Sequence, residues 1–199
     1  MNDAWARPVT LTGRHIRLEP MSVEHAYGLV EVVDEHMFDL FPGPYFPLEP
    51  TVEGLTKYIE ARITQPATVP FVAIDLKEGK PVASSSFFEI VPAHRTLEIG
   101  HTWIRKDLRG TYVNPEMKFL MLQHAFETLN AIRVQIRTDK RNLQSQAAIE
   151  KLGAKKEGEF RNSLIMPDGH LRTSVFYSIL PEEWPEVKEN LSSRLEQYL

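Results

Sequence analysis

The stretch LEIGHTWIRKDLRGTYVNPEMKFLMLQHAFETLNAIRVQIRT (Leu97–Thr138) decides the fold. Its alternating start, Leu97–Ile104, predicts a strand, and RGTYVN (Arg109–Asn114) predicts a glycine-containing turn. A long apolar segment follows and predicts a helix to about Leu129. IRVQIRT (Ile132–Thr138) predicts a second strand, and a further helix is expected from Asn142 to Leu152, with Gly153 as its stop signal.

Hairpins and helices are predicted on both sides of this run. Before it, the patterns indicate a strand over 14–19, a helix from Ser22 to about Glu35, an ordered loop over Phe41–Pro50 and a helix from Thr51 to about Thr64. Two hairpins are expected, one with arms Phe71–Leu76 and Pro81–Ile90 and one around Asp168–Gly169 with arms Glu157–Ile165 and Leu171–Leu180. An amphipathic helix follows Pro181. The order predicts one α/β domain over 1–199, with a mixed, mostly antiparallel sheet and helices on both faces.

Composition excludes several classes of function. The 199 residues carry a net charge of −4, so no basic surface indicates nucleic-acid binding. The chain contains no cysteine, which excludes thiol catalysis and Cys-ligated zinc. The seven histidines lack metal-binding spacings, and we expect no metal. No apolar run reaches 18 residues and the first residues lack a signal-peptide core, so we expect no membrane association and a cytoplasmic location.

The turn between the first strand and the long helix has the features of an anion site. Asn114 is a good N-cap and Pro115 suits the first helical position. The free N–H groups and the positive end of the macrodipole would favour a phosphate there. Arg109 adds a cation, and Gly110 allows the backbone to approach a ligand closely. The layout therefore predicts a site for a phosphate-bearing cofactor, while a plain strand-to-helix loop stays an alternative.

Glu98 is the candidate base on the first strand. Alternation places Leu97, Ile99, His101 and Trp103 on one face and Glu98, Gly100, Thr102 and Ile104 on the other. Glu98 thus shares a face with a glycine that leaves space beside it. Partial burial would raise the pKa of its carboxyl, as suits a general base near neutral pH. The alternative is a solvated carboxylate paired with Arg95 or Arg133.

Taken together, these segments resemble the GNAT superfamily of N-acetyltransferases, and within it the RimJ/RimL type that acts on ribosomal-protein N-termini. The resemblance covers nearly the whole chain. Its parts are GRHIRLEPM (Gly13–Met21), LEIGHTWI, RGTYVNPEMKFLMLQHAFETL, and TDKRNLQSQAAIEKLGAKKEGEFR followed by PDGHLRTSVFYSIL. The family's N-x-x-S/A…LGF ending is matched by Asn142, Ser145 and Leu152–Gly153–Ala154.

The resemblance implies an acetyl-CoA-dependent transfer in which an amine attacks the thioester directly. It implies that Glu98 is the base, directly or through water, and that a backbone N–H near Trp103–Ile104 stabilises the oxyanion. Asn142 would hold the pantetheine arm and Ser145 would bond or protonate the thiol sulfur. Many relatives have a tyrosine four residues after the Ser145 position; Ile149 stands there, so Ser145 is the expected acid and Tyr177 a weaker candidate. The pyrophosphate would contact a loop made of Arg109, Gly110, Thr111, Tyr112, Val113 and Asn114.

Two residues, one just before that loop and one within it, depart from the family's Q/R-x-x-G-x-G/A pattern. Asp107 replaces the polar or basic residue and brings negative charge. Tyr112 replaces the second small residue, and in a left-handed conformation it would cost about 1–2 kcal/mol. Alternatively, the loop is reshaped and Tyr112 packs on CoA or lines the acceptor cleft.

The sequence thus predicts an acetyl-CoA-dependent N-acetyltransferase acting on a protein N-terminus, an amino acid or a small amine. Two rivals stay open: a non-catalytic acyl-CoA-binding module with a degenerate loop, and a structural subunit. The last hairpin and the C-terminal helix could form the interface of a homodimer.

Overall fold

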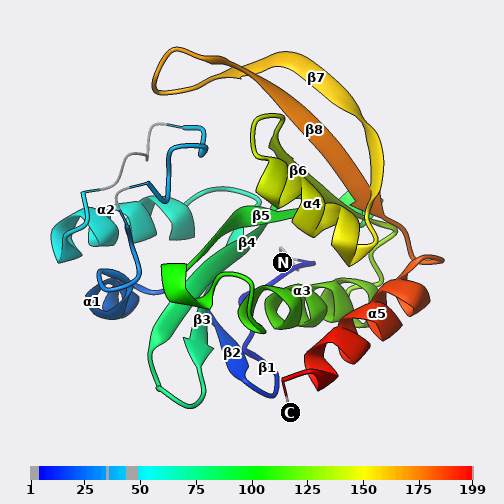
Figure 1. The fold of residues 1–199 in the computed structure, drawn as a ribbon, viewed down its shortest axis with the longest axis horizontal. Coiled ribbons are helices and arrows are strands. Elements are labelled where there is room, and N and C mark those ends of the chain that lie inside the picture. The colour runs from blue at the N-terminus through cyan, green and yellow to red at the C-terminus, as the bar shows by residue number, and fades with distance from the viewer. Residues whose placement is uncertain (1–4, 35, 44–48, 199) are drawn as a thin grey trace.

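The computed structural model describes residues 5–34, 36–43 and 49–198. Its centre is an eight-stranded sheet in the order β1-β2-β3-β4-β5-β6-β8-β7 (Figure 1). Every neighbouring pair is antiparallel except β5 and β6, which are parallel, so the expected mixed, mostly antiparallel sheet is confirmed. The strands are β1 Leu11–Thr12, β2 Ile16–Pro20, β3 Val69–Asp75, β4 Pro81–Val91, β5 Thr96–Ile104, β6 Arg133–Asp139, β7 Lys155–Ile165 and β8 Leu171–Ile179.

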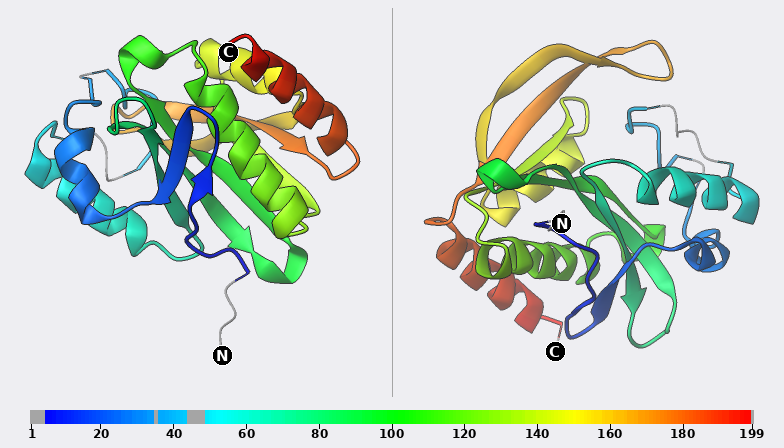
Figure 2. Two further views of the ribbon diagram at one scale, coloured as in Figure 1. Left: turned by 90° about the horizontal axis from the view of Figure 1, so that it is seen from below. Right: turned by 180° about the vertical axis from the view of Figure 1, so that it is seen from behind.

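Helices cover both faces of this sheet, as predicted (Figure 2). One apolar core lies between the sheet and α3, α4 and α5, and a second lies between the sheet and α1 and α2. The helices are α1 Ala26–Leu29, α2 Val52–Ile63, α3 Val113–Gln123, α4 Leu143–Leu152 and α5 Trp184–Glu196. None of the described helices is long and apolar enough to cross a membrane.

Local signals in the sequence locate most elements well. Both predicted hairpins are present, and α5 buries Trp184, Val187 and Leu191 as an amphipathic helix should. The helix expected from Ser22 to Glu35 is shorter, because a 3-10 turn over Val23–His25 and α1 end by Leu29. The Val30–Val33 segment, rich in β-branched side chains that disfavour helix, then continues in turns. The predicted loop Phe41–Pro50 lies partly outside the described residues, which omit 44–48.

A β-bulge in the middle of β5 overturns the predicted alternation. Ser84 pairs with Trp103 and Ser86 with Gly100, so β5 has one more residue than β4 between these pairs. His101 takes up the extra residue with a left-handed φ of 51°. Beyond the bulge the faces are exchanged: Leu97 and Ile99 belong to the core under α3, whereas Trp103 belongs to the core under α2 and Ile104 packs on the α3 side.

Helix α3 begins two residues earlier than its capping signal predicts. Its N-cap is Tyr112 and its first residue is Val113, so Asn114 lies inside the helix and is not the cap. A π-helical turn over His124–Thr128 extends the helix almost to Leu129, close to the predicted end. Glu116 anchors the helix to the β1–β2 turn, because its buried carboxylate accepts hydrogen bonds from the backbone N–H groups of Arg14 and His15.

Candidate functional site

The central feature of the site is a fork between the parallel strands β5 and β6. Their pairing runs from Thr96–Arg133 only to Glu98–Gln135, although β5 continues to Ile104 and β6 to Asp139. Gly100, His101, Thr102 and Ile104, in the middle of an eight-stranded sheet, are all only half-buried. A central strand therefore has an open edge beyond Glu98.

Ile104 directs its backbone polar groups to this open edge. The N–H of Arg105 donates to the Val82 carbonyl on the β4 side, and successive strand residues point their N–H groups to opposite edges. The Ile104 carbonyl accordingly accepts a hydrogen bond from Arg109 Nε, 3.1 Å away, on the far side from β4. Of the two residues predicted to supply an oxyanion donor, Ile104 therefore has its N–H at the fork, whereas the Trp103 side chain is buried against Tyr58 and Phe38.

Glu98 lies at the last paired position before the fork and is only 1% exposed. Gln135 Nε2 donates to Oε2 at 2.6 Å, and Arg137 Nε lies 3.0 Å from Oε1. Burial raises the pKa of the Glu98 carboxyl to about 7 against the opposing effects of Arg137 and Gln135. The predicted burial and raised pKa are thus present, but the partners are neither Arg95 nor Arg133. The space expected beside Gly100 is filled by the Phe88 ring, which a Cβ at that position would meet at 2.7 Å.

The bulge residue His101 is the second polar group on this face. Its Nδ1 lies 3.1 Å from Arg62 Nη2, and its ring contacts Phe88 with centroids 4.4 Å apart. Burial and the neighbouring arginine lower the pKa of His101 to about 3, so the imidazole is neutral. Because Arg62 can only donate, Nδ1 accepts and the ring proton is on Nε2.

The loop from β5 to α3 presents backbone donors at the end of the fork. Gly110 has a φ of 81°, the left-handed conformation that glycine adopts freely. Thr111 Oγ1 donates to the Leu108 carbonyl at 2.7 Å and closes the turn. The first N–H groups of a helix have no acceptor within it, and Pro115 has none to offer, so the N–H groups of Val113 and Asn114 are the ones directed outward.

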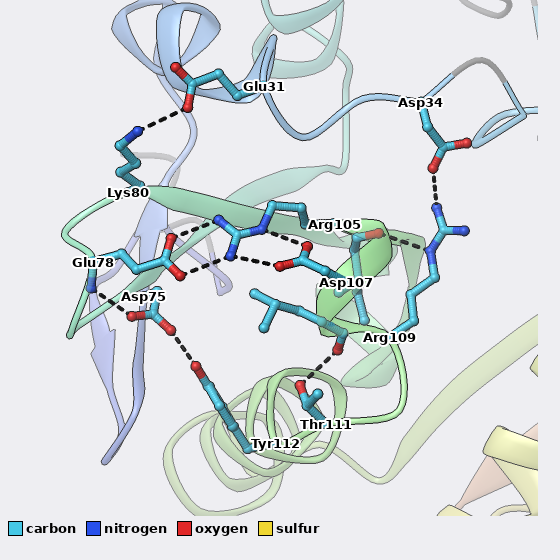
Figure 3. A network of polar contacts seen from close by, with 12 residues as sticks. Glu31, Asp34, Asp75, Glu78, Lys80, Arg105, Asp107, Arg109, Thr111 and Tyr112 are labelled. Atoms are coloured by element: carbon cyan, nitrogen blue, oxygen red, sulfur yellow. Dashed lines mark hydrogen bonds and ion pairs between the residues drawn. The ribbon is translucent and has the colours of Figure 1, made fainter.

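Ion pairs hold the charged side chains of this loop (Figure 3). Arg105 bonds to both carboxylate oxygens of Glu78, at 2.7 and 2.9 Å, and to Asp107 at 2.8 Å. The negative charge of Asp107 is therefore compensated locally. Arg109 Nη2 donates to Asp34 at 2.6 Å, so the predicted phosphate cation is held by a carboxylate in this structure.

Tyr112 does not adopt the left-handed conformation that would strain it. Its φ is −63°, in the right-handed region, and Gly110 alone in this loop is left-handed. Its hydroxyl donates to buried Asp75 at 2.5 Å, and its ring packs against His15 and Tyr198 (Figure 3). The side chain thus points away from the outward N–H groups and ties the loop to β3 and to the end of α5.

Helix α4 begins as predicted. Asn142 is its N-cap and accepts a hydrogen bond from the Ser145 N–H at 2.9 Å, and Gly153 ends it with a φ of 101°. Ser145 is half-buried in the first turn, whereas Ile149 is in the core. Tyr177 donates to Glu150 at 3.1 Å, and burial and this carboxylate raise its pKa to about 12. A group so reluctant to lose its proton is a poor acid, which leaves Ser145 as the better candidate.

Sequence reasoning missed several polar groups around the fork. Gln135 and Arg137 on β6 hold Glu98, and Lys118 on α3 reaches the opposite face of the bulge. The Lys118 amine donates to Thr102 Oγ1 at 2.7 Å, and burial lowers its pKa to about 7. A lysine within an otherwise apolar stripe of α3 was the available signal. No cluster of metal-ligating side chains occurs among the described residues.

Comparison with known proteins identifies the family of this chain. Residues 15–155 match the family model of the acetyltransferase (GNAT) domain. The chain is 31% identical over 109 residues to a Bacillus subtilis protein named "Putative ribosomal N-acetyltransferase YdaF". That match covers 55% of this chain and 58% of the length of the relative.

Solved structures share the fold over almost the whole chain. A "putative acetyltransferase" from T. thermophilus is 39% identical, with a TM-score of 0.87 over 96% of this chain and 99% of its own. Mycobacterium smegmatis RimJ, solved in complex with CoA-disulfide, is 19% identical with a TM-score of 0.79 over 94% of each chain, a likeness of fold. The family match spans more than half of the chain and includes both strands of the fork. The chain therefore belongs to the GNAT family of N-acetyltransferases.

Proposed function

We propose that this protein transfers the acetyl group of acetyl-CoA to a primary amine by direct attack of the amine on the thioester. One observation carries the proposal: the pairing of β5 and β6 ends at a buried glutamate, with the open edge of Ile104 and the outward N–H groups of α3 beyond it. An extended amide-containing arm can bond to the open edge, and a pyrophosphate fits the N-terminus of a helix.

Glu98 is the group we assign to removing the proton of the acceptor ammonium, directly or through water. The Ile104 N–H would stabilise the oxyanion that develops as the amine attacks. Asn142 and Ser145, one turn apart at the start of α4, would hold the pantetheine arm and protonate the departing thiolate. Val113, Asn114, Gly110 and Thr111 would bind the pyrophosphate, together with Arg109 once Asp34 releases it. The RimJ structure with bound CoA-disulfide supports acetyl-CoA as the acetyl donor.

The acceptor is expected to be a protein N-terminus, an amino acid or a small amine. The partial match to a protein named as a ribosomal N-acetyltransferase supports a protein N-terminus among these.

We also infer that the protein forms a homodimer through the β7–β8 hairpin, which exposes Phe160, Ile165 and Leu171. Sedimentation velocity that shows only monomers at micromolar concentration would contradict the dimer.

The decisive test is release of free thiol from acetyl-CoA in the presence of a panel of amines, with mass spectrometry of the product. We expect thiol and acetylated amine in equal amounts. Calorimetry with CoA provides the second measurement. CoA binding without turnover of any amine would favour the non-catalytic binding module, and absence of both would favour a structural subunit.

A further inference from the structure

The side of the sheet that carries Glu98 also carries an arginine without an ionic partner. On β8, Val175, Tyr177 and Ile179 belong to the core under α3 and α5. The alternate residues Arg172, Ser174 and Phe176 therefore face the opposite side, as Glu98 does. The β7–β8 hairpin to which they belong extends past the rest of the sheet and curves toward the side of α2 (Figures 1 and 2).

Arg172 is 5% exposed, yet its guanidinium forms no ion pair and donates no hydrogen bond within the described part of the chain. Its Nε is fully enclosed and has no acceptor. Taking a guanidinium out of water costs several kcal/mol unless a partner replaces the water, and natural proteins pair such groups. The missing partner is the observation that points to a ligand.

Arg172 and two neighbouring arginines share two buried carboxylates. Arg137 lies on the same side, held over the rings of Phe88 and Phe176 at 5.4 and 5.8 Å and against Glu98. Asp139 is the other buried carboxylate nearby, and Arg141 already bonds to it through its backbone N–H at 2.8 Å and its guanidinium at 3.0 Å. Glu89, 3.7 Å from Arg137, is largely exposed. Glu98 is thus the one buried carboxylate left for Arg137 and Arg172 among these groups.

An acceptor must bring an ammonium group to Glu98, into the neighbourhood of these two cations. A polyamine would add positive charge to positive charge. An amine that carries its own carboxylate would instead bring an anion to the guanidinium that lacks one, in the planar two-point geometry that arginine offers to carboxylates.

We propose that Arg172, assisted by Arg137, forms a carboxylate-binding subsite, and that the acceptor is a primary amine with a carboxylate a few bonds from its nitrogen. This proposal rests on the proposed acetyl transfer to an amine. The carboxylate has two possible sources, the α-carboxylate of a free amino acid and the side chain of an acidic first residue in a peptide.

Matched acceptor pairs test the subsite. Alanine is compared with alaninamide, and a C-terminally amidated peptide beginning with Asp is compared with the same peptide beginning with Asn. We expect the wild type to prefer the carboxylate member of at least one pair, and that pair identifies the source. The variant Arg172→Met should raise KM for the preferred acceptor about 10- to 100-fold and change KM for its amide partner less than about twofold.

Two further variants separate binding from folding. Arg172→Lys keeps the charge and should recover part of the affinity for the carboxylate acceptor. Arg161 is an exposed arginine of the same hairpin, and Arg161→Met should leave KM for both members of the pair unchanged. Arg172→Met should not lower the Tm, because removing a buried unpaired cation does not destabilise the core. Equal effects on both members of a pair, a raised KM for acetyl-CoA, or no preference in the wild type would overturn the proposal.

Calorimetry distinguishes failure of the subsite from failure of acetyl transfer. With CoA present, the preferred carboxylate acceptor should bind to the wild type and bind at least about tenfold more weakly to Arg172→Met. Turnover of amines without any carboxylate preference would reject the subsite and keep the transferase. Carboxylate binding without turnover would reject the transferase and keep the subsite.

Discussion

At the scale of single residues, the protonation of Glu98 controls the proposed chemistry. Because burial sets its pKa at about 7, the carboxylate needed as a base forms as the pH rises through 7. We expect kcat/KM to increase across this range and to level off above it. Glu98→Gln should lower kcat by about 10²- to 10⁴-fold and abolish this pH dependence, measured by thiol release from pH 6 to 9.

The same shift has a consequence for stability. Burial raises the pKa of Glu98 from its ordinary 4.5 to about 7 in the folded state, so protonation of this carboxyl stabilises the fold. This contribution to the free energy of unfolding is complete below pH 4.5, declines as the pH rises and is lost above pH 7. Glu98→Gln should therefore gain stability over the wild type at pH 8, by up to about 3 kcal/mol. Glu157→Gln, which alters an exposed partner of Arg133, is the control and should show neither effect. A full rate in Glu98→Gln at every pH would rule out Glu98 as the base.

Tyr112 is predicted to anchor its loop rather than to strain it. Tyr112→Phe removes the donor to buried Asp75 and should lower the free energy of unfolding by about 1–2 kcal/mol, measured by urea denaturation. Tyr112→Gly also removes the contacts with His15 and Tyr198 and should weaken CoA binding in calorimetry. Tighter CoA binding in Tyr112→Gly would mean that the tyrosine obstructs the loop after all.

At the scale of elements, α3 carries a buried lysine, Lys118, that forms no ion pair among the described residues. Burial lowers the pKa of Lys118 to about 7, below its ordinary 10.5, so the penalty is complete below pH 7 and disappears as the pH rises toward 10.5. Lys118→Met should raise the free energy of unfolding by about 1–4 kcal/mol at pH 6, and by less at pH 9. Since Thr102 and Ser85 lie 2.8 Å apart, they can bond to each other without the lysine. A variant less stable at pH 6 would show that the amine has a structural role.

The elements also show what a sequence can and cannot predict. The hairpin turns, the N-cap Asn142 and the C-terminal Gly153 of α4 depend on residues close together in the sequence. The structure has each of them at the predicted position. The His101 bulge is not, because it depends on how β4 and β5 align, and a single extra residue exchanges every side chain beyond it between faces. Asn114 has the chemistry of a cap, yet tertiary contacts of Tyr112 and Glu116 fix where α3 begins.

At the scale of the whole molecule, the site combines residues from separate elements. Strand β5 supplies Glu98, β6 supplies Gln135 and Arg137, and β8 supplies Arg172. These strands are separated in the sequence and become neighbours only in the folded sheet. Local patterns could place Glu98 on a strand and the loop before a helix. They could not show that β6 supplies the partners of Glu98, or that β8 adds an unpaired arginine.

The forked sheet turns one backbone amide into a reporter of occupancy. An amide proton that no neighbouring strand holds exchanges quickly with deuterated solvent, whereas the paired amides on the β4 side of β5 exchange slowly. Beyond Glu98, none of the described strands pairs with the edge that Ile104 faces. In the free protein, deuterium should therefore enter Ile104 well before Arg105, whose N–H is bonded to Val82. If acetyl-CoA fills the fork as a strand would, its addition should slow the exchange of Ile104 and leave Arg105 unchanged.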